Sequence, residues 1–211
     1  MQRIAVIDYG MGNLRSVSRA IEHVAPNDQV IVTADADTIH GADRIVCPGQ
    51  GAALACMQAL GAIGMVELIK DVIGQKPFLG ICMGYQVLFD HSDENGGVPC
   101  LGYFPGHVEQ FASPLHDQQQ QRLKVPHMGW SEVDQVQSHP LWQGIESTTR
   151  FYFAHSYYCQ PANAAVVAGM CNYGHPFAAA VAESMVFACQ FHPEKSGQAG
   201  LRLLENFVQW S

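Results

Sequence analysis

Apolar runs of strand length alternate with helix-length amphipathic segments in the first ninety residues of the chain. This alternation is typical of βαβ units, in which parallel strands form a sheet that helices cover on both faces. The runs predict buried strands at Ile4–Asp8, Gln29–Val32, Arg44–Cys47 and Phe78–Ile81. The amphipathic segments predict helices over Leu14–Val24, over Ala52–Ile73 with interruptions at Gly61 and Gly64, and over Met83–Asp90.

The pattern changes after about residue 100, where strand-like segments follow one another with little helix between them. They lie at Gly106–Phe111, Arg122–Val125, Arg150–Tyr158, Ala164–Cys171, Phe177–Glu183 and Met185–Phe191. We expect antiparallel pairing here, with a tight hairpin at Glu183-Ser184 and a final amphipathic helix over Leu201–Trp210. The low-complexity stretch His116–Gln121 is short and predicts a solvated loop. The fold prediction is one α/β domain over residues 1–211, with a mainly parallel central sheet flanked by helices and an antiparallel C-terminal half.

Charge and composition limit the classes of partner and the cellular compartment that we expect. The formal net charge is −8, and no Lys or Arg occurs between Lys76 and Arg122, so we expect no nucleic-acid partner. No uninterrupted apolar run approaches the roughly 18 residues of a membrane span, so no membrane partner is expected. The first residues, MQRIAVIDYG, place Asp8 inside the apolar run, unlike a secretory signal. We therefore expect a cytoplasmic protein.

The seven cysteines do not form a disulfide or metal-binding pattern. Their number is odd and no CxxC spacing occurs. Cys47, Cys171 and Cys189 lie in apolar, strand-like runs, where a reduced thiol packs as a small hydrophobic group. No His, Asp and Glu cluster has the spacing of metal ligands either. We expect no metal and no cofactor.

Cys82 differs from the other cysteines because it stands between a predicted strand and a predicted helix, in the sequence Gly80-x-Cys82-x-Gly84. A sharp turn there exposes the sulfur, directs backbone N–H groups at a developing oxyanion and favours the thiolate through the helix N-terminus. Small residues two positions before and after allow the close approach of strand and helix, as in a nucleophile elbow. Taken alone, the pentapeptide fits a buried structural cysteine equally well.

A candidate base follows another predicted strand, in Phe191-His192-Pro193-Glu194. His192 is expected at the carboxyl end of that strand, where open α/β sheets bind ligands. Glu194 is placed to orient the imidazole and to stabilise its cation. Alone, His192 also fits a satisfied core histidine and Glu194 a helix N-terminal acid. The combination with the Cys82 turn favours a nucleophile and its base.

A third stretch, Pro48-Gly49-Gln50-Gly51, follows the strand Arg44–Cys47. Its glycines allow backbone N–H groups to face a pocket, although a plain strand-to-helix turn explains the same residues. Together the three stretches resemble the class I (triad) glutamine amidotransferases, and the similarity extends over essentially the whole chain. The family usually has an aliphatic residue at the position of Gln50, which leaves the resting conformation of this loop open.

The resemblance implies a set of roles. Cys82 would attack the side-chain amide of L-glutamine to form a glutamyl thioester, with His192 as base and acid and Glu194 orienting it. Backbone N–H groups of Met83 and of Gln50 or Gly51 would bind the oxyanion. The positions that the resemblance assigns to glutamine binding are Gly49, Gln86, His155 and Ser156.

Further stretches resemble one branch of the family, the glutaminase subunits of imidazole glycerol phosphate synthase. They are Asp8–Leu14, Pro126–Trp130, Ala154–Tyr157 and Lys195-Ser196. The resemblance implies a heterodimer with a (β/α)8-barrel cyclase that receives the ammonia for histidine biosynthesis. The positions implied at that interface are Asn13, Trp130, Tyr157 and Lys195.

Two alternatives to this function remain open from the sequence. A paralogous triad glutaminase could serve a different acceptor synthase with the same three residues. A non-catalytic scaffold could keep the fold only to bind a partner, although the presence of Cys82, His192 and Glu194 disfavours it.

Overall fold

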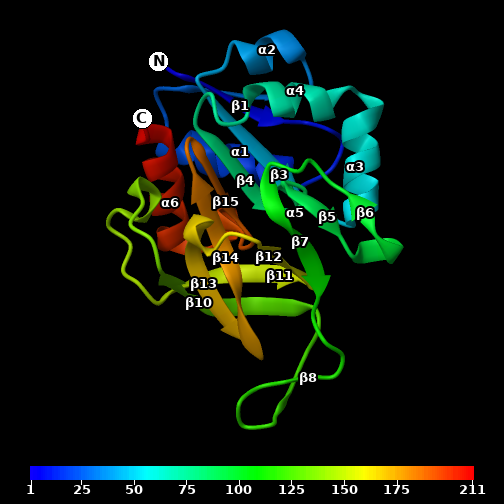
Figure 1. Ribbon diagram of the computed structural model, residues 1–211. Helices are drawn as coiled ribbons and strands as arrows, with labels where there is room; N and C mark the ends of the chain where they lie inside the picture. Colours follow the sequence, from blue (N-terminus) through cyan, green and yellow to red (C-terminus); the bar gives the residue numbers. More distant parts are fainter.

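The structure, a computed structural model, describes all residues from Met1 to Ser211. A 13-stranded mixed sheet runs through the molecule, and a separate two-stranded sheet lies outside it (Figure 1). One half of the large sheet is parallel, in the order β2-β1-β3-β4-β15. These strands are β1 (Arg3–Ile7), β2 (Gln29–Thr33), β3 (Arg44–Gly49), β4 (Phe78–Cys82) and β15 (Val186–Cys189).

The other half of the large sheet is largely antiparallel and continues from β15 in the order β14-β12-β7-β5-β6. Strands β13, β10 and β11 branch from β14, and β8 pairs only with β9. The bounds are β5 (Phe89–Ser92), β6 (Val98–Pro99), β7 (Phe104–Gln110), β8 (Leu115–His116), β9 (Arg122–Leu123), β10 (His127–Gln135), β11 (Thr149–His155), β12 (Tyr157–Pro161), β13 (Val167–Tyr173) and β14 (His175–Glu183). The fold class predicted from the sequence is therefore confirmed.

Helices cover both faces of the parallel half, because its central strands carry apolar side chains on both faces. On β1, Ile4 and Val6 pack with α1 (Leu14–Val24) and α6 (Gly197–Gln209), whereas Ala5 and Ile7 pack toward α3 (Ala53–Ala62) and α4 (Met65–Val72). In Figure 1 the red α6 and the cyan α3 accordingly lie on opposite sides of these strands. The shorter helical segments are α2 (Ala36–His40), α5 (Met83–Gln86), η1 (Glu94–Gly96), η2 (Pro140–Trp142), η3 (Ala164–Val166) and η4 (Pro193–Lys195).

The helix predicted over Met83–Asp90 is the clearest error in the N-terminal half. Only α5 forms, and the chain re-enters the sheet at Phe89 as β5. Phe89 is fully buried between the rings of Tyr85 and Phe104, at centroid distances of 5.4 and 5.8 Å. Tertiary packing therefore overrides the local helical pattern. The prediction of β2 as a buried strand was also wrong, since it is an edge strand without a fully buried residue.

Three strand predictions in the C-terminal half need correction, and one strand was missed. Arg150–Tyr158 is broken at Ser156 into β11 and β12, and the segment predicted over Ala164–Cys171 begins as the helical turn η3. Only Arg122–Leu123 is extended in the segment predicted to reach Val125. The nine-residue strand β10 was missed because most of its residues are polar or partly exposed, so no clear apolar alternation marks it.

The hairpin and the last helix lie close to their predicted positions. Glu183 pairs with Val186, so the two residues of the turn are Ser184 and Met185, one residue later than expected. The helix α6 begins at Gly197, before the predicted start at Leu201. No single helix has the length and apolarity needed to cross a membrane. Helices α3 and α4 have sufficient length and apolarity only as a pair, and the chain bends by 91° at the break between them.

Candidate active site

Cys82 occupies a strained turn between β4 and α5. Its backbone has φ 56° and ψ −110°, a region that a non-glycine residue rarely adopts. The turn brings α5 against β3 so closely that a Cβ on Gly84 would lie 1.9 Å from the Cys47 carbonyl oxygen. A Cβ on Gly80 would lie 2.8 Å from the Gly84 carbonyl oxygen. Both glycines therefore have the steric reason that the sequence pattern predicted.

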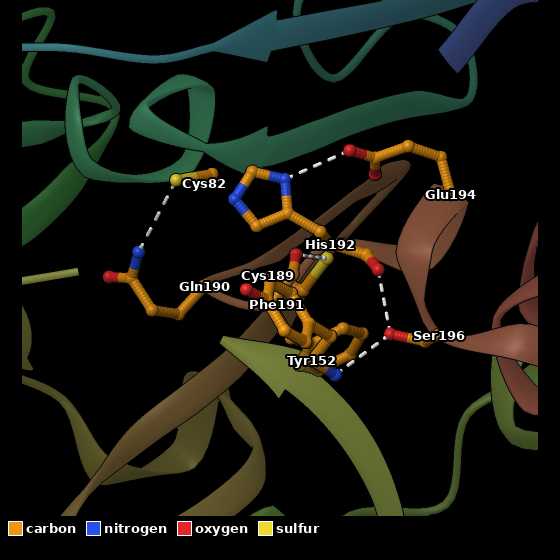
Figure 2. Close-up of polar contacts among 8 residues, drawn as sticks. All are labelled: Cys82, Tyr152, Cys189, Gln190, Phe191, His192, Glu194 and Ser196. Atoms are coloured by element: carbon orange, nitrogen blue, oxygen red, sulfur yellow. Dashed lines mark hydrogen bonds and ion pairs between the residues drawn. The ribbon is translucent and has the colours of Figure 1, made fainter. Parts of the chain in front are cut away.

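His192 and Glu194 meet Cys82 because β15 pairs with β4 in parallel, so both strands end at the same edge of the sheet. The His192 Nδ1 lies 2.9 Å from Glu194 Oε1, and the Glu194 side chain is fully buried. Figure 2 shows the imidazole between this carboxylate and the Cys82 side chain. Burial opposes the imidazolium, but hydrogen bonds and charge from Cys82 and Glu194 outweigh it and raise the pKa of His192 to about 9.

Ser196 holds the backbone of His192 in place through two hydrogen bonds. Its Oγ donates to the His192 carbonyl at 2.6 Å and accepts from the Tyr152 N–H at 2.9 Å (Figure 2). The His192 N–H donates in turn to the Tyr152 carbonyl at 2.9 Å. The sequence assigned no role to Ser196, because its contact with β11 spans 44 residues.

Gln190 is a second residue that sequence reasoning missed. It is fully buried, and its Nε2 lies 3.9 Å from the Cys82 Sγ (Figure 2). Its Oε1 accepts from Gln86 Nε2 at 2.8 Å, and the same Nε2 lies 3.0 Å from the Tyr157 carbonyl oxygen. Gln190 therefore links the expected glutamine-binding residue Gln86 to the sulfur of Cys82.

A cavity of about 380 Å³ opens beside Cys82. It is lined by Gln50, Gly51, Cys82, Met83, Gln86, Glu94, Pro126, Met128, Ala154, His155, Ser156, Tyr157, His192 and Lys195. The expected oxyanion residues thus come together with the nucleophile and base candidates. Three of the four expected glutamine-binding residues also line the cavity, whereas Gly49 does not and is buried against Gly84.

Two charged side chains line the cavity, and a lining residue holds an unsatisfied acceptor that is itself buried. Glu94 and Lys195 supply one carboxylate and one ammonium group, and the buried Oε1 of Gln86 has no hydrogen-bond partner. The sequence did not single out Glu94, which reaches the site from η1. An isolated acidic residue in a loop carries no signal of this kind.

His155 is positioned by a chain of buried hydrogen bonds. Its Nδ1 lies 2.7 Å from the Tyr157 carbonyl oxygen and its Nε2 lies 3.0 Å from His127 Nδ1, while His127 Nε2 lies 2.8 Å from Ser131 Oγ. Burial lowers the pKa of His155 to about 3 and that of His127 to about 4. Both rings are therefore neutral at physiological pH, with Nδ1–H as the donor of each.

Residues 5–210 match the family model of the class I glutamine amidotransferases. The chain belongs to that family. The HisH subunit of imidazole glycerol phosphate synthase from Thiobacillus denitrificans is 57% identical over 99% of this chain and 91% of its own length. The HisH subunit from Dechloromonas aromatica is also 57% identical, over 99% and 97% of the two chains.

Solved structures show the same fold at much lower identity. A chain of PurLQS from Thermotoga maritima superimposes with a TM-score of 0.75 over 100% of this chain and 99% of its own, at 18% identity. A glutamine amidotransferase superimposes with a TM-score of 0.71 over 98% and 97% of the two chains, at 16% identity. The class I amidotransferase fold is thus shared where the sequences have diverged widely.

The four residues expected at a partner interface of this amidotransferase fall into two groups. Tyr157 and Lys195 line the cavity itself, and Lys195 Nζ lies 5.9 Å from the centre of the Tyr152 ring. Trp130 is 53% exposed, while Asn13 precedes α1 without capping it through its side chain. Met128 also lines the cavity and is 65% exposed. No group of three or more His, Cys, Asp or Glu side chains is arranged to hold a metal ion.

Proposed function

We propose that this chain is the glutaminase subunit of imidazole glycerol phosphate synthase, which hydrolyses L-glutamine and passes ammonia to a cyclase subunit in histidine biosynthesis. The observation that carries the proposal is the junction of Cys82, His192 and Glu194 at one edge of the sheet, beside a cavity of about 380 Å³. Family membership, and the similarity to HisH subunits over 99% of this chain, support the cyclase subunit as the acceptor of the ammonia.

In the proposed reaction, the Cys82 sulfur attacks the side-chain amide carbon of glutamine. His192 takes the thiol proton and returns it to the leaving nitrogen, so ammonia departs and a glutamyl thioester remains. A water molecule, deprotonated by His192, then releases glutamate and restores the thiol. Glu194 holds the imidazole through Nδ1 and stabilises its cation, in agreement with the raised pKa of His192.

The oxyanion of both tetrahedral intermediates would be bound by backbone N–H groups. Met83 begins α5, so its N–H has no partner within that helix. The N–H groups of Gln50 and Gly51 have no acceptor within the chain. These residues come from two separate segments and line the same cavity, which supports binding of a negative charge there.

Glutamine recognition follows from the charges in the cavity wall. We assign the α-ammonium group of the substrate to Glu94, the α-carboxylate to Lys195, and a donor of the substrate to the unsatisfied Oε1 of Gln86. A pocket lined by one carboxylate and one ammonium group, with a buried amide oxygen behind its wall, suits a polar α-amino acid.

We place the cyclase, a (β/α)8 barrel, over the cavity mouth. The exposed side chains of Met128 and Trp130 lie on β10, and large apolar side chains of this kind are enriched in protein interfaces. Closing the mouth would keep ammonia from solvent. We also propose that the heterodimer works in the cytoplasm, which agrees with seven free cysteines.

Glutamine-dependent and ammonia-dependent cyclase activity together test this function. We expect glutamate formation by the complex to disappear in Cys82→Ala, while added ammonium salts still support product formation by the cyclase. Glutamine turnover by Cys82→Ala at the wild-type rate would contradict the proposal. Glutamine hydrolysis without any effect of the cyclase would favour a glutaminase that serves another acceptor.

A further inference from the structure

Two buried side chains form hydrogen bonds with carbonyl groups of the loop Pro48–Ala52. Tyr9, which follows β1, donates from its hydroxyl to the Pro48 carbonyl at 2.9 Å. Cys56, in the first turns of α3, donates from its thiol to the Gln50 carbonyl at 3.4 Å. The two side chains also meet, with 3.9 Å between the Tyr9 hydroxyl and the Cys56 Sγ. Neither residue lines the cavity or has a role in the proposed chemistry.

Both groups remain protonated and can therefore donate at neutral pH. Burial raises the pKa of Cys56 to about 11, and the hydrogen bonds from Tyr9 and to Gln50 do not cancel this effect. Burial likewise raises the pKa of Tyr9 above its ordinary range. A hydroxyl and a thiol that stay protonated form fixed donors for the two loop carbonyls.

The direction of the Gln50 carbonyl determines the direction of the next N–H. In a planar trans peptide, the carbonyl of one residue and the N–H of the next point to opposite sides. With the Gln50 carbonyl turned toward Cys56, the Gly51 N–H points away from Cys56. Gly51 forms part of the cavity wall, whereas Cys56 does not. That N–H has no partner in the chain and is free to bind an oxyanion.

We propose that Tyr9 and Cys56 are positioning residues that hold the Gln50–Gly51 peptide with its N–H toward the oxyanion of the glutaminase reaction. This inference rests on the proposed function. Gly51 has φ +90°, and glycine crosses φ/ψ space with little steric cost, so the peptide can rotate when the thiol is removed. Rotation would present a carbonyl oxygen to the developing negative charge.

The kinetic test compares two variants, each of which removes the sulfur of one buried cysteine. In complex with the cyclase, Cys56→Ala should lower kcat for glutamine hydrolysis about tenfold with little change in KM, because an oxyanion donor acts mainly in the transition state. Cys171→Ala, on β13, is the matched control and should leave kcat unchanged. Cys56→Ser keeps a donor and should recover most of the rate, while Tyr9→Phe should lower kcat without removing the ring.

Alkylation of Cys82 by iodoacetamide separates loop positioning from damage to the nucleophile. That reaction forms no oxyanion, so its rate should be the same in Cys56→Ala and in the control. A kcat of Cys56→Ala no lower than that of Cys171→Ala would overturn the inference, as would an equal fall in alkylation rate.

Crystal structures give an outcome that does not depend on turnover. The Gln50 carbonyl should point toward residue 56 in the wild-type protein and away from it in Cys56→Ala. The same peptide direction in both would contradict the inference even in a protein without glutaminase activity. A wild-type complex that fails to hydrolyse glutamine, with the peptide turning as expected, would instead contradict the proposed function.

Discussion

Replacing Gly84 by alanine tests whether the Cys82 turn depends on close contact between α5 and β3. The added Cβ would lie 1.9 Å from the Cys47 carbonyl oxygen and 2.8 Å from its carbonyl carbon. Because Cβ contacts below 3.0 Å essentially never occur, the two backbones must separate by at least 1.1 Å, the difference between 3.0 and 1.9 Å. Neither contact involves a flexible side chain, so relaxation requires movement of the backbone itself.

This movement should affect both stability and catalysis. Overpacking a buried backbone contact of this kind costs about 2–4 kcal/mol of unfolding free energy. The same shift moves the Met83 N–H relative to Gln50 and Gly51, which line the same cavity. A displacement of about 1 Å in a catalytic arrangement costs about 100-fold in rate, so we expect kcat to fall by that factor.

The assays are urea unfolding and glutamine hydrolysis in the presence of the cyclase. Gly61→Ala is the matched control, because Gly61 lies in α3 without a positive φ, and a Cβ added there would meet nothing within 4 Å. That variant should gain about 0.5–1 kcal/mol from helix propensity. If Gly84→Ala were as stable and as active as Gly61→Ala, the steric explanation of the turn would be refuted.

Three further predictions concern buried polar groups. In Glu194→Gln the imidazole pKa of His192, raised to about 9, should fall in an NMR titration, and an unchanged value would exclude the carboxylate as its cause. Tyr85→Phe removes a buried hydroxyl bonded to a β14 carbonyl at 3.1 Å and should cost about 1 kcal/mol in urea unfolding. His127 and His155 have lowered pKa values in the folded protein, so below pH 6.5 the unfolded state binds protons that the folded state does not. The free energy of unfolding is therefore unaffected above pH 6.5. As the pH falls toward 4, it decreases by up to about 1.4 kcal/mol per histidine and pH unit. Unfolding free energies measured at pH 7.5 and 5.5 should differ less in His127→Asn.

The parallel half of the fold could be predicted because each element is defined by its own sequence pattern. Apolar runs and helical periodicity identified β1, α1, β3 and β4, and the glycines around Cys82 predicted the turn that the structure contains. The helix after Cys82 was predicted too long because the burial of Phe89 depends on Phe104, on another strand. Local periodicity contains no information about such a partner.

In the candidate site, too, residues with a local sequence pattern could be predicted and residues that depend on distant contacts could not. The sequence singled out Cys82, His192 and Gln50 because glycine or proline neighbours make their stretches distinctive. It could not identify Glu94, whose carboxylate accepts from the Ala53 N–H at 2.6 Å across 41 residues of chain. Gln190 was missed for the same reason, since its contact with Cys82 spans 108 residues. Supporting side chains of this kind become visible only when the sheet brings the loops together.

Trapping of the acyl enzyme shows whether Cys82 is the nucleophile of the glutaminase reaction. The complex with the cyclase is mixed with glutamine, quenched in acid during turnover, digested and analysed by mass spectrometry. We expect a glutamyl adduct on the peptide that contains Cys82, on none of the other six cysteines, and absent from Cys82→Ala. Glutamine turnover without an adduct at Cys82, or with the adduct on another cysteine, would contradict this role of Cys82.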